Sequence, residues 1–465
     1  MSQRFLCFLS LKLRTNKRAF RLPAQMAWPL PLDRIRVQAP AGRVILAATD
    51  KGTPHGAAGR MTSRIRFSLI SISSLLVFYI LIGGLLGKNN STGDRTYRDM
   101  GVYSEVLSRI KQDYVTEPNL KKVTDGAVRG LLEALDPYST YLDPQEYQDY
   151  LQRPTPGPAD VGIFLSKRLG FVTVVSVLPG SPAEKAGLKV GDLFDRIENT
   201  STRDLSVVQI QRLLAGSEAS TVTIAVVREP RGEPQKIPVK RAVLVYPPAV
   251  SKVVDNDSGY IRVATFNKGR AAEIAAKVKE LTAGGSNKIV LDLRNCAGGE
   301  VKEAVETASL FLDKGLVCYL FGQHYPREDF AAKPPARVCD LPLAVLINQS
   351  TAGPAEIVAS AILGNKRGDV VGIRSFGIGV VQKAIAVGDG SAVLLSVAKY
   401  YGPDGKTLQD NGVTPNVVQL PGGGIASLED ESEPEGPEHF GEKDDQQLRK
   451  AIEVLKQKSA PAKAA

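Results

Sequence analysis

Histidine and cysteine are scarce in this 465-residue chain, which has three histidines, four cysteines and one tryptophan. The cysteines are scattered, and no Cys-x-x-Cys pair occurs. This scarcity argues against a His/Cys metal cluster. We expect no metal site and no cofactor. Cys318 and Cys339 could be bridged across a hairpin, or the cysteines could be buried free thiols.

Outside the N-terminal 60 residues, the chain has little net charge. Residues 1–60 carry eleven Lys and Arg and only two acidic residues, which is +9 of the chain's net charge of +10. The rest of the chain is nearly neutral and lacks the basic surface typical of nucleic-acid binding. We expect residues 1–60 to be unstructured or a mis-annotated extension, with translation starting at Met61.

One long hydrophobic run is present, "FSLISISSLLVFYILIGGLLG" at residues 67–87. As a helix it would be about 31 Å long, which is the thickness of the bilayer's hydrocarbon core. Arg60, Arg64 and Arg66 precede it, which favours a cytosolic N-terminus. We therefore expect a single-pass signal anchor and linker at 61–94 in the inner (cytoplasmic) membrane, with the bulk of the chain periplasmic. A cleaved signal peptide is the alternative.

The remainder reads as an α/β multidomain protein. The hydrophobic period is helical over 95–155, and Val-rich short strands fill 160–244. Strands and amphipathic helices alternate over 245–420, with buried strands such as "KIVLDLRN" and "LPLAVLIN". Residues 421–442 form an acidic Gly/Pro linker, and 443–465 form a C-terminal helix and tail.

Four motifs occur in an order that resembles the carboxyl-terminal processing peptidases, also called tail-specific proteases. They are "LDPYSTYLD" (135–143), "GSPAEKAGLKVGD" (180–192), "LDLRNCAGGEVKEAVETASLFLDKG" (291–315) and "AKYYGPDGKTLQDNGVTPNV" (398–417). The resemblance covers residues 95–457. It implies an N-terminal helical domain, a PDZ domain, and an α/β peptidase core of the ClpP/crotonase type.

The family resemblance also implies a serine/lysine dyad, but neither residue is present here. A serine nucleophile needs a base, and a buried lysine can serve because desolvation lowers its pKa. In "TAGPAEI" the nucleophile position holds Gly353, and 25 residues later, in "FGIG", the lysine position holds Ile378. Pro354 replaces an oxyanion-hole donor because proline has no N–H. Gln382 matches the family's supporting glutamine, and Gly298 and Gly299 are possible oxyanion glycines.

These replacements predict a pseudopeptidase, a family member without peptidase activity. The alternative is an active C-terminal processing peptidase with a relocated nucleophile. Its candidate groups are Ser350, Thr351, Ser360 and Ser375 with Lys366 and Lys383, or a triad that includes His324.

The PDZ resemblance implies binding of peptide or protein C-termini by strand addition. The corresponding residues are Gly162, Ile163, Phe164 and Leu165, where Phe164 replaces a second glycine of the family pattern. A PDZ domain retained only for packing is the alternative. The partners we expect are peptide C-termini and an active protease or cell-envelope protein, with no nucleic acid.

Overall fold

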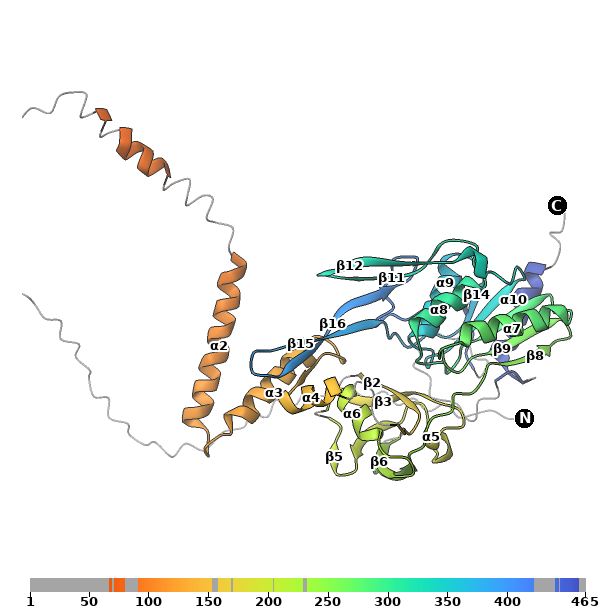
Figure 1. Ribbon diagram of the computed structural model, residues 1–465, viewed down its shortest axis with the longest axis horizontal. Helices are drawn as coiled ribbons and strands as arrows, with labels where there is room; N and C mark the ends of the chain where they lie inside the picture. The colour runs from red at the N-terminus through yellow and green to blue at the C-terminus, as the bar shows by residue number, and fades with distance from the viewer. Residues whose placement is uncertain are drawn as a thin grey trace, which may run out of the picture. The chain divides into compact units, whose positions relative to one another are not determined.

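The computed structural model describes residues 67–68, 71–79, 91–152, 158–168, 170–203, 205–228, 232–421, 440–442 and 444–459. The chain divides into two units, residues 1–97 and 98–465, and every β-sheet lies in the second (Figure 1). The expected extension at 1–60 and most of the acidic linker at 421–442 lie outside the described residues.

The expected membrane segment is only partly described. Residues 71–79 are helical, whereas residues 69–70 and 80–87 lie outside the described residues. Within the part of the chain that the structure describes, no helix combines the length and apolar character needed to cross a membrane. The anchor expected from the sequence is thus not found there.

Three helices with polar N-terminal signals follow, as the sequence period predicts. They are α2 (Ser91–Asp113), α3 (Leu120–Glu133) and α4 (Pro144–Gln152). Asn119 begins α3, because its side-chain oxygen accepts a hydrogen bond from the Lys122 N–H at 3.0 Å. Between α3 and α4 lies β1 (Thr140–Leu142), a strand that the sequence analysis did not anticipate.

The next module is a sheet of short antiparallel strands with two small helices. The elements are β2 (Ile163–Arg168), β3 (Phe171–Val177), α5 (Pro182–Lys185), β4 (Leu193–Ile197), β5 (Thr200–Ser201), α6 (Val207–Leu214), β6 (Thr221–Val227) and β7 (Gln235–Lys240). The strand order is β2-β3-β4-β6-β7, so β2 is an outer strand. This module has a buried core of its own, which contains Val172, Phe194 and Ile210.

The third module is built on a sheet ordered β17-β14-β13-β10-β9-β8, in which all neighbouring pairs except β8–β9 are parallel. Its elements are β8 (Val250–Val254), β9 (Ser258–Arg262), α7 (Arg270–Ala283), β10 (Lys288–Asp292), α8 (Val301–Ser309), β13 (Leu343–Ile347), α9 (Pro354–Gly364), β14 (Asp369–Gly372), β17 (Val417–Val418) and α10 (Gln446–Ser459). This mixed α/β architecture confirms the fold class at the level of a sheet covered by helices.

Side-chain alternation explains why β13 is apolar throughout. Leu343, Val345 and Ile347 belong to the large core that includes residues of α7, α8 and α9. Ala344 and Leu346 face the other way, toward the apolar side of α10. Both faces of the strand are therefore buried, as expected for a parallel sheet covered on both sides.

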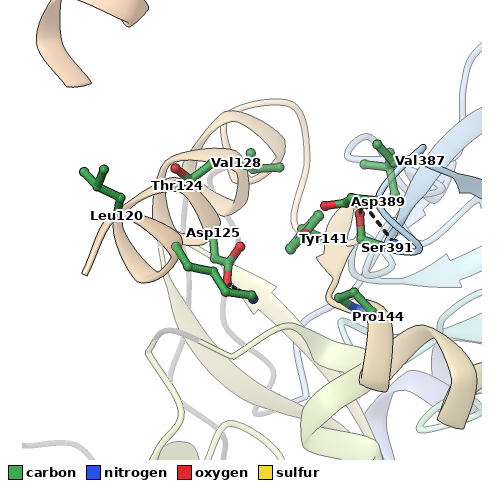
Figure 2. Close-up of a pocket in the computed structure, with 11 residues that line it drawn as sticks. Leu120, Thr124, Asp125, Val128, Tyr141, Pro144, Val387, Asp389 and Ser391 are labelled. Carbon is green, nitrogen blue, oxygen red and sulfur yellow. Dashed lines mark hydrogen bonds and ion pairs between the residues drawn. The ribbon is translucent and has the colours of Figure 1, made fainter. Parts of the chain in front are cut away.

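A second sheet joins the helical segment to this core. It contains β11 (Leu316–Gly322), β12 (Tyr325–Ala331), β15 (Val380–Ala386) and β16 (Ala392–Tyr401), and β1 pairs with β16. An open pocket lies among α3, β1 and the β15–β16 turn, where Asp389 accepts a hydrogen bond from the Ser391 N–H at 3.0 Å (Figure 2). His324 lies in the β11–β12 hairpin turn, as expected.

The three described cysteines are free and buried. Cys318 lies on β11 and Cys339 lies ahead of β13, and both pack in the large core together with Cys296. Burial raises the pKa of the Cys318 thiol to about 12, so the thiol stays protonated and behaves as a small apolar group. The structure thus favours free thiols over the Cys318–Cys339 bridge.

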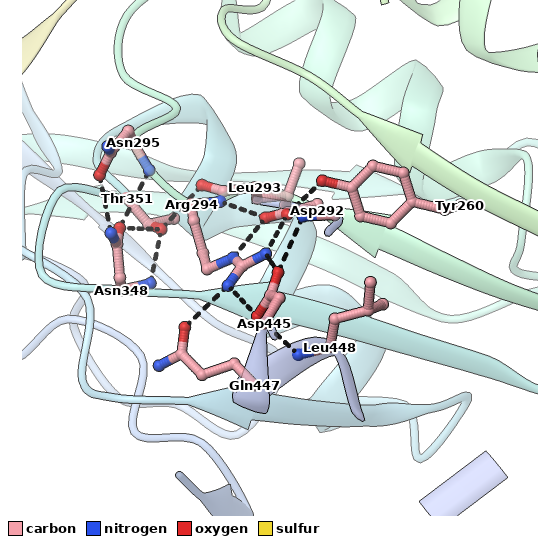
Figure 3. Close-up of polar contacts among 11 residues, drawn as sticks. Tyr260, Asp292, Leu293, Arg294, Asn295, Asn348, Thr351, Asp445, Gln447 and Leu448 are labelled. Carbon is pink, nitrogen blue, oxygen red and sulfur yellow. Dashed lines mark hydrogen bonds and ion pairs between the residues drawn. The ribbon is translucent and has the colours of Figure 1, made fainter. Parts of the chain in front are cut away.

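A buried ionic network fixes α10 to the sheet (Figure 3). Arg294 donates to Asp292 Oδ1 at 2.9 Å and to Asp445 Oδ2 at 2.6 Å, and all three side chains are buried. The Tyr260 hydroxyl donates to Asp292 Oδ2 at 2.7 Å. Asp445 also accepts from the Leu448 N–H at 3.0 Å, so the residue that pairs with Arg294 also caps α10.

We predict that Asp445→Ala lowers the free energy of unfolding by about 3–5 kcal/mol, because it leaves a buried arginine short of a partner. Urea denaturation followed by circular dichroism measures this. Glu453→Ala on the exposed side of α10 is the control, with an expected change within about 0.5 kcal/mol. Equal stability of the two variants would contradict the anchoring role of Asp445.

Candidate functional site

The turn between β13 and α9 has the geometry of a strained strand-to-helix elbow. Gly353 has φ +63° and ψ −118°, and Pro354 is the first residue of α9. A Cβ at residue 353 would have no neighbouring atom within 4 Å, so the position opens into free space. Such a turn presents one side chain at the end of a sheet, but here it presents none.

The loop containing Ile378 lies against this turn. One carboxylate, Glu356 on α9, accepts hydrogen bonds from the Gly353 N–H at 2.9 Å and the Ile378 N–H at 2.8 Å. It also accepts from the Gly377 N–H at 2.8 Å and the Ser375 hydroxyl at 2.5 Å. The Gly353 turn and the Ile378 loop therefore meet in space.

Glu356 is fully buried, and burial raises its pKa to about 7 although the four donors lower it. Within the described part of the chain, no arginine or lysine forms an ion pair with Glu356. Hydrogen bonds therefore carry the stabilisation of this carboxylate.

Ile378 packs in a small apolar cluster. Its members are Val175 of β3, Ala297, Ala352, Phe164 of β2 and Phe376. Val175, Ala297 and Ala352 are each at most 2% exposed. The cluster joins the second module to the carboxyl ends of β10 and β13, and Ser176 adds a hydrogen bond to the Asn295 carbonyl at 2.7 Å. An amine at residue 378 would face mainly hydrocarbon.

The two candidate oxyanion glycines lie at this junction. Gly298 has φ +75°, and a Cβ there would come within 2.0 Å of the Phe164 ring. Gly299 has φ +105°, and a Cβ there would come within 2.4 Å of the Phe266 backbone. The Phe164 ring thus covers the glycine turn. The PDZ resemblance implied a place for Phe164 in the peptide-binding loop, whereas in the structure its ring lies against Gly298 of the third module.

Gln382 on β15 donates a hydrogen bond to the Tyr138 carbonyl at 2.6 Å, so it connects the sheet to the helical segment. The alternative nucleophiles are all buried. The Ser375 hydroxyl donates to Glu356 and accepts from the Val413 N–H at 2.6 Å. The Thr351 hydroxyl donates to the Leu293 carbonyl at 2.8 Å. Among the described residues, no hydrogen bond between a lysine and any of these hydroxyl groups is found.

The peptide-binding loop expected at residues 162–165 begins β2. Asp160 Oδ1 accepts from the Val161 N–H at 2.6 Å and the Gly162 N–H at 3.1 Å. Gly162 has φ +83°, which a residue with a side chain rarely adopts. Ile163 and Leu165 pack on the core of this module.

Comparison with known proteins shows three sequence-family matches. Residues 257–419 match peptidase family S41, residues 173–228 match the PDZ domain, and residues 85–146 match the N-terminal domain of the activating protease CtpB.

Two curated relatives cover most of the chain. A Bacillus subtilis carboxy-terminal processing protease, CtpA, is 30% identical over 77% of this chain and 76% of its own length. A Picosynechococcus carboxyl-terminal-processing protease is 30% identical over 76% of this chain and 84% of its own. Among solved structures, a photosystem II D1 C-terminal processing protease matches with a TM-score of 0.57 and 27% identity, over 68% of this chain and 92% of that one.

The raised pKa of Glu356 predicts a pH dependence of stability. The unfolded carboxyl loses its proton near pH 4.5 but the folded one near pH 7. Between these values the folded state holds more protons, so the free energy of unfolding falls as pH rises from about 4.5 to 7 and is flat above. The full change is about 3 kcal/mol.

Urea denaturation from pH 4 to 8 tests this for Glu356→Gln against the original chain. The variant should lose this part of the pH dependence, whereas Glu280→Gln, at an exposed position, should keep it. Parallel pH profiles for Glu356→Gln and the original chain would show that Glu356 titrates normally.

Proposed function

Because this chain belongs to the carboxy-terminal processing protease family, with an S41 peptidase domain and a PDZ domain, we propose that it is a pseudopeptidase of that family. It binds the C-termini of peptides or proteins and does not cleave them.

The observation that carries this proposal is the convergence of Gly353 and Ile378 on Glu356. The backbone of the elbow is retained, but the residue at its apex has no hydroxyl. The facing loop offers an isoleucine packed among apolar side chains. Pro354 has no N–H with which to hold an oxyanion. Loss of a nucleophile or its base costs on the order of 10⁶ in rate, and both are missing here.

We assign peptide binding to the PDZ domain. Among the described strands, β2 pairs with β3 alone, so its other edge carries backbone groups that an extended peptide can pair with. The peptide's terminal carboxylate would lie near the start of β2, around Gly162 and Ile163. We expect a preference for apolar terminal side chains, because β2 and α6 border the apolar core of this domain, to which Leu165 and Val207 belong.

The proposed cellular location rests on the uncharged, hydrophobic run at residues 67–87 alone. We place the chain at the inner membrane with its domains on the periplasmic side, as the uncharged run and the preceding arginines favour. In that setting the bound partner is a peptide, an active protease or another cell-envelope protein.

We predict peptide binding without turnover. The full chain is incubated with an unstructured protein that has an apolar C-terminus, cleavage is followed by mass spectrometry, and binding is followed by fluorescence anisotropy. Cleavage that Ser350→Ala, Ser360→Ala or Ser375→Ala abolishes would establish the relocated nucleophile and overturn the proposal.

Restoring the missing groups gives a sharper test. The triple variant Gly353→Ser, Pro354→Ala, Ile378→Lys should gain trace cleavage, because a hydroxyl, a donor and a base return to the same elbow. Gly353→Ser with Pro354→Ala alone is the control and should remain inactive for want of a base. A folded triple variant with no activity would contradict the assignment of these positions.

A further inference from the structure

A charged hollow lies at the far end of β2, away from the expected carboxylate position. Glu133, Pro137, Lys167, Gly170, Phe171 and Arg203 line it. Two walls come from the PDZ domain, and the third comes from the end of α3 and the turn after it. Tyr138 in that turn shares a hydrogen bond of 2.9 Å with Ser166 of β2, which holds the third wall against the strand.

The hollow lies at the end of β2, along the strand that the bound peptide is expected to pair with. Lys167 is on β2, and its ammonium donates to the Arg203 carbonyl at 2.8 Å and the Leu205 carbonyl at 3.4 Å. Leu205 directly precedes Ser206, which caps α6. The Lys167 side chain therefore reaches the segment just ahead of α6, so the hollow lies between the end of β2 and the start of α6.

The geometry of strand pairing determines which residue of the bound peptide lies at the hollow. A terminal carboxylate at Gly162 and Ile163 makes the peptide run antiparallel to β2. Each residue then advances about 3.3 Å along the strand, in step with β2. Lys167 is four residues beyond Ile163, so the fourth or fifth peptide residue before the C-terminal one lies at the hollow.

The charges lining the hollow do not cancel. Lys167 is 4% exposed and pairs with Glu133, whose side chain is 51% exposed. Arg203 is exposed, and its guanidinium lies over the Phe171 ring, 5.4 Å from the centroid. Within the described residues, no carboxylate forms an ion pair with Arg203. Among the described residues that line the hollow, two cations and one carboxylate give a net positive charge.

We propose that this hollow is a specificity subsite for an acidic side chain four or five residues before the C-terminal residue of the bound peptide. Arg203 pairs with the carboxylate, and the Phe171 ring holds the guanidinium in place by a cation–π contact. The subsite rests on the proposed peptide-binding function and adds a sequence preference to it.

The test uses the full chain and labelled peptides of about twelve residues with an identical apolar C-terminus. One peptide has Glu at both the fourth and fifth positions before the last residue, and the other has Gln there. Fluorescence anisotropy should show roughly two- to fivefold tighter binding of the Glu peptide, the size expected of an exposed ion pair. The preference should shrink as salt is raised, because salt screens exposed charges.

Arg203→Glu should reverse the preference and leave the affinity for the Gln peptide nearly unchanged. Arg196→Glu is the matched control, since Arg196 is an exposed arginine of the same domain that does not line the hollow. Equal binding of the two peptides, or an unchanged preference in Arg203→Glu, would overturn the subsite and leave the proposed function standing. Failure of both peptides to bind would overturn both.

Discussion

One buried carboxylate holds the candidate site together. Glu356 binds three backbone N–H groups and one hydroxyl, and these donors come from two loops more than twenty residues apart in sequence. Burial of such a group is costly unless it is hydrogen-bonded, so the loops and the carboxylate depend on each other. The elbow at Gly353 therefore keeps its strained shape without a nucleophile to present.

The sequence predicted the parts of this site that depend on local pattern. Apolar runs located β13 and β10, and the glycines and prolines located the turn before α9 and the loop before β15. The spacing between Gly353 and Ile378 then matched them to positions in the peptidase family. The role of Glu356 was missed because its partners are fixed by tertiary packing, although a glutamate three residues after a helix-starting turn is a known capping signal.

Contacts between modules were harder to anticipate. Phe164 was assigned to the peptide-binding loop from its neighbours in sequence, yet its ring covers Gly298, more than 130 residues later. The strand β1 was not predicted, because it is only three residues long and forms by pairing with β16. In both cases the residue is positioned by a contact with a residue distant in sequence. Hydrophobic periodicity reports only local structure, so it does not predict such contacts.

The anchoring of α10 has a consequence for the order in which this protein folds. Arg294 meets Asp445 across 151 residues of chain, and the apolar face of α10 covers the same side of the sheet. During synthesis the sheet is complete before its covering helix leaves the ribosome. Contacts this distant in sequence form late and slow folding, so the apolar face of the sheet stays uncovered in the nascent chain until α10 has been synthesised.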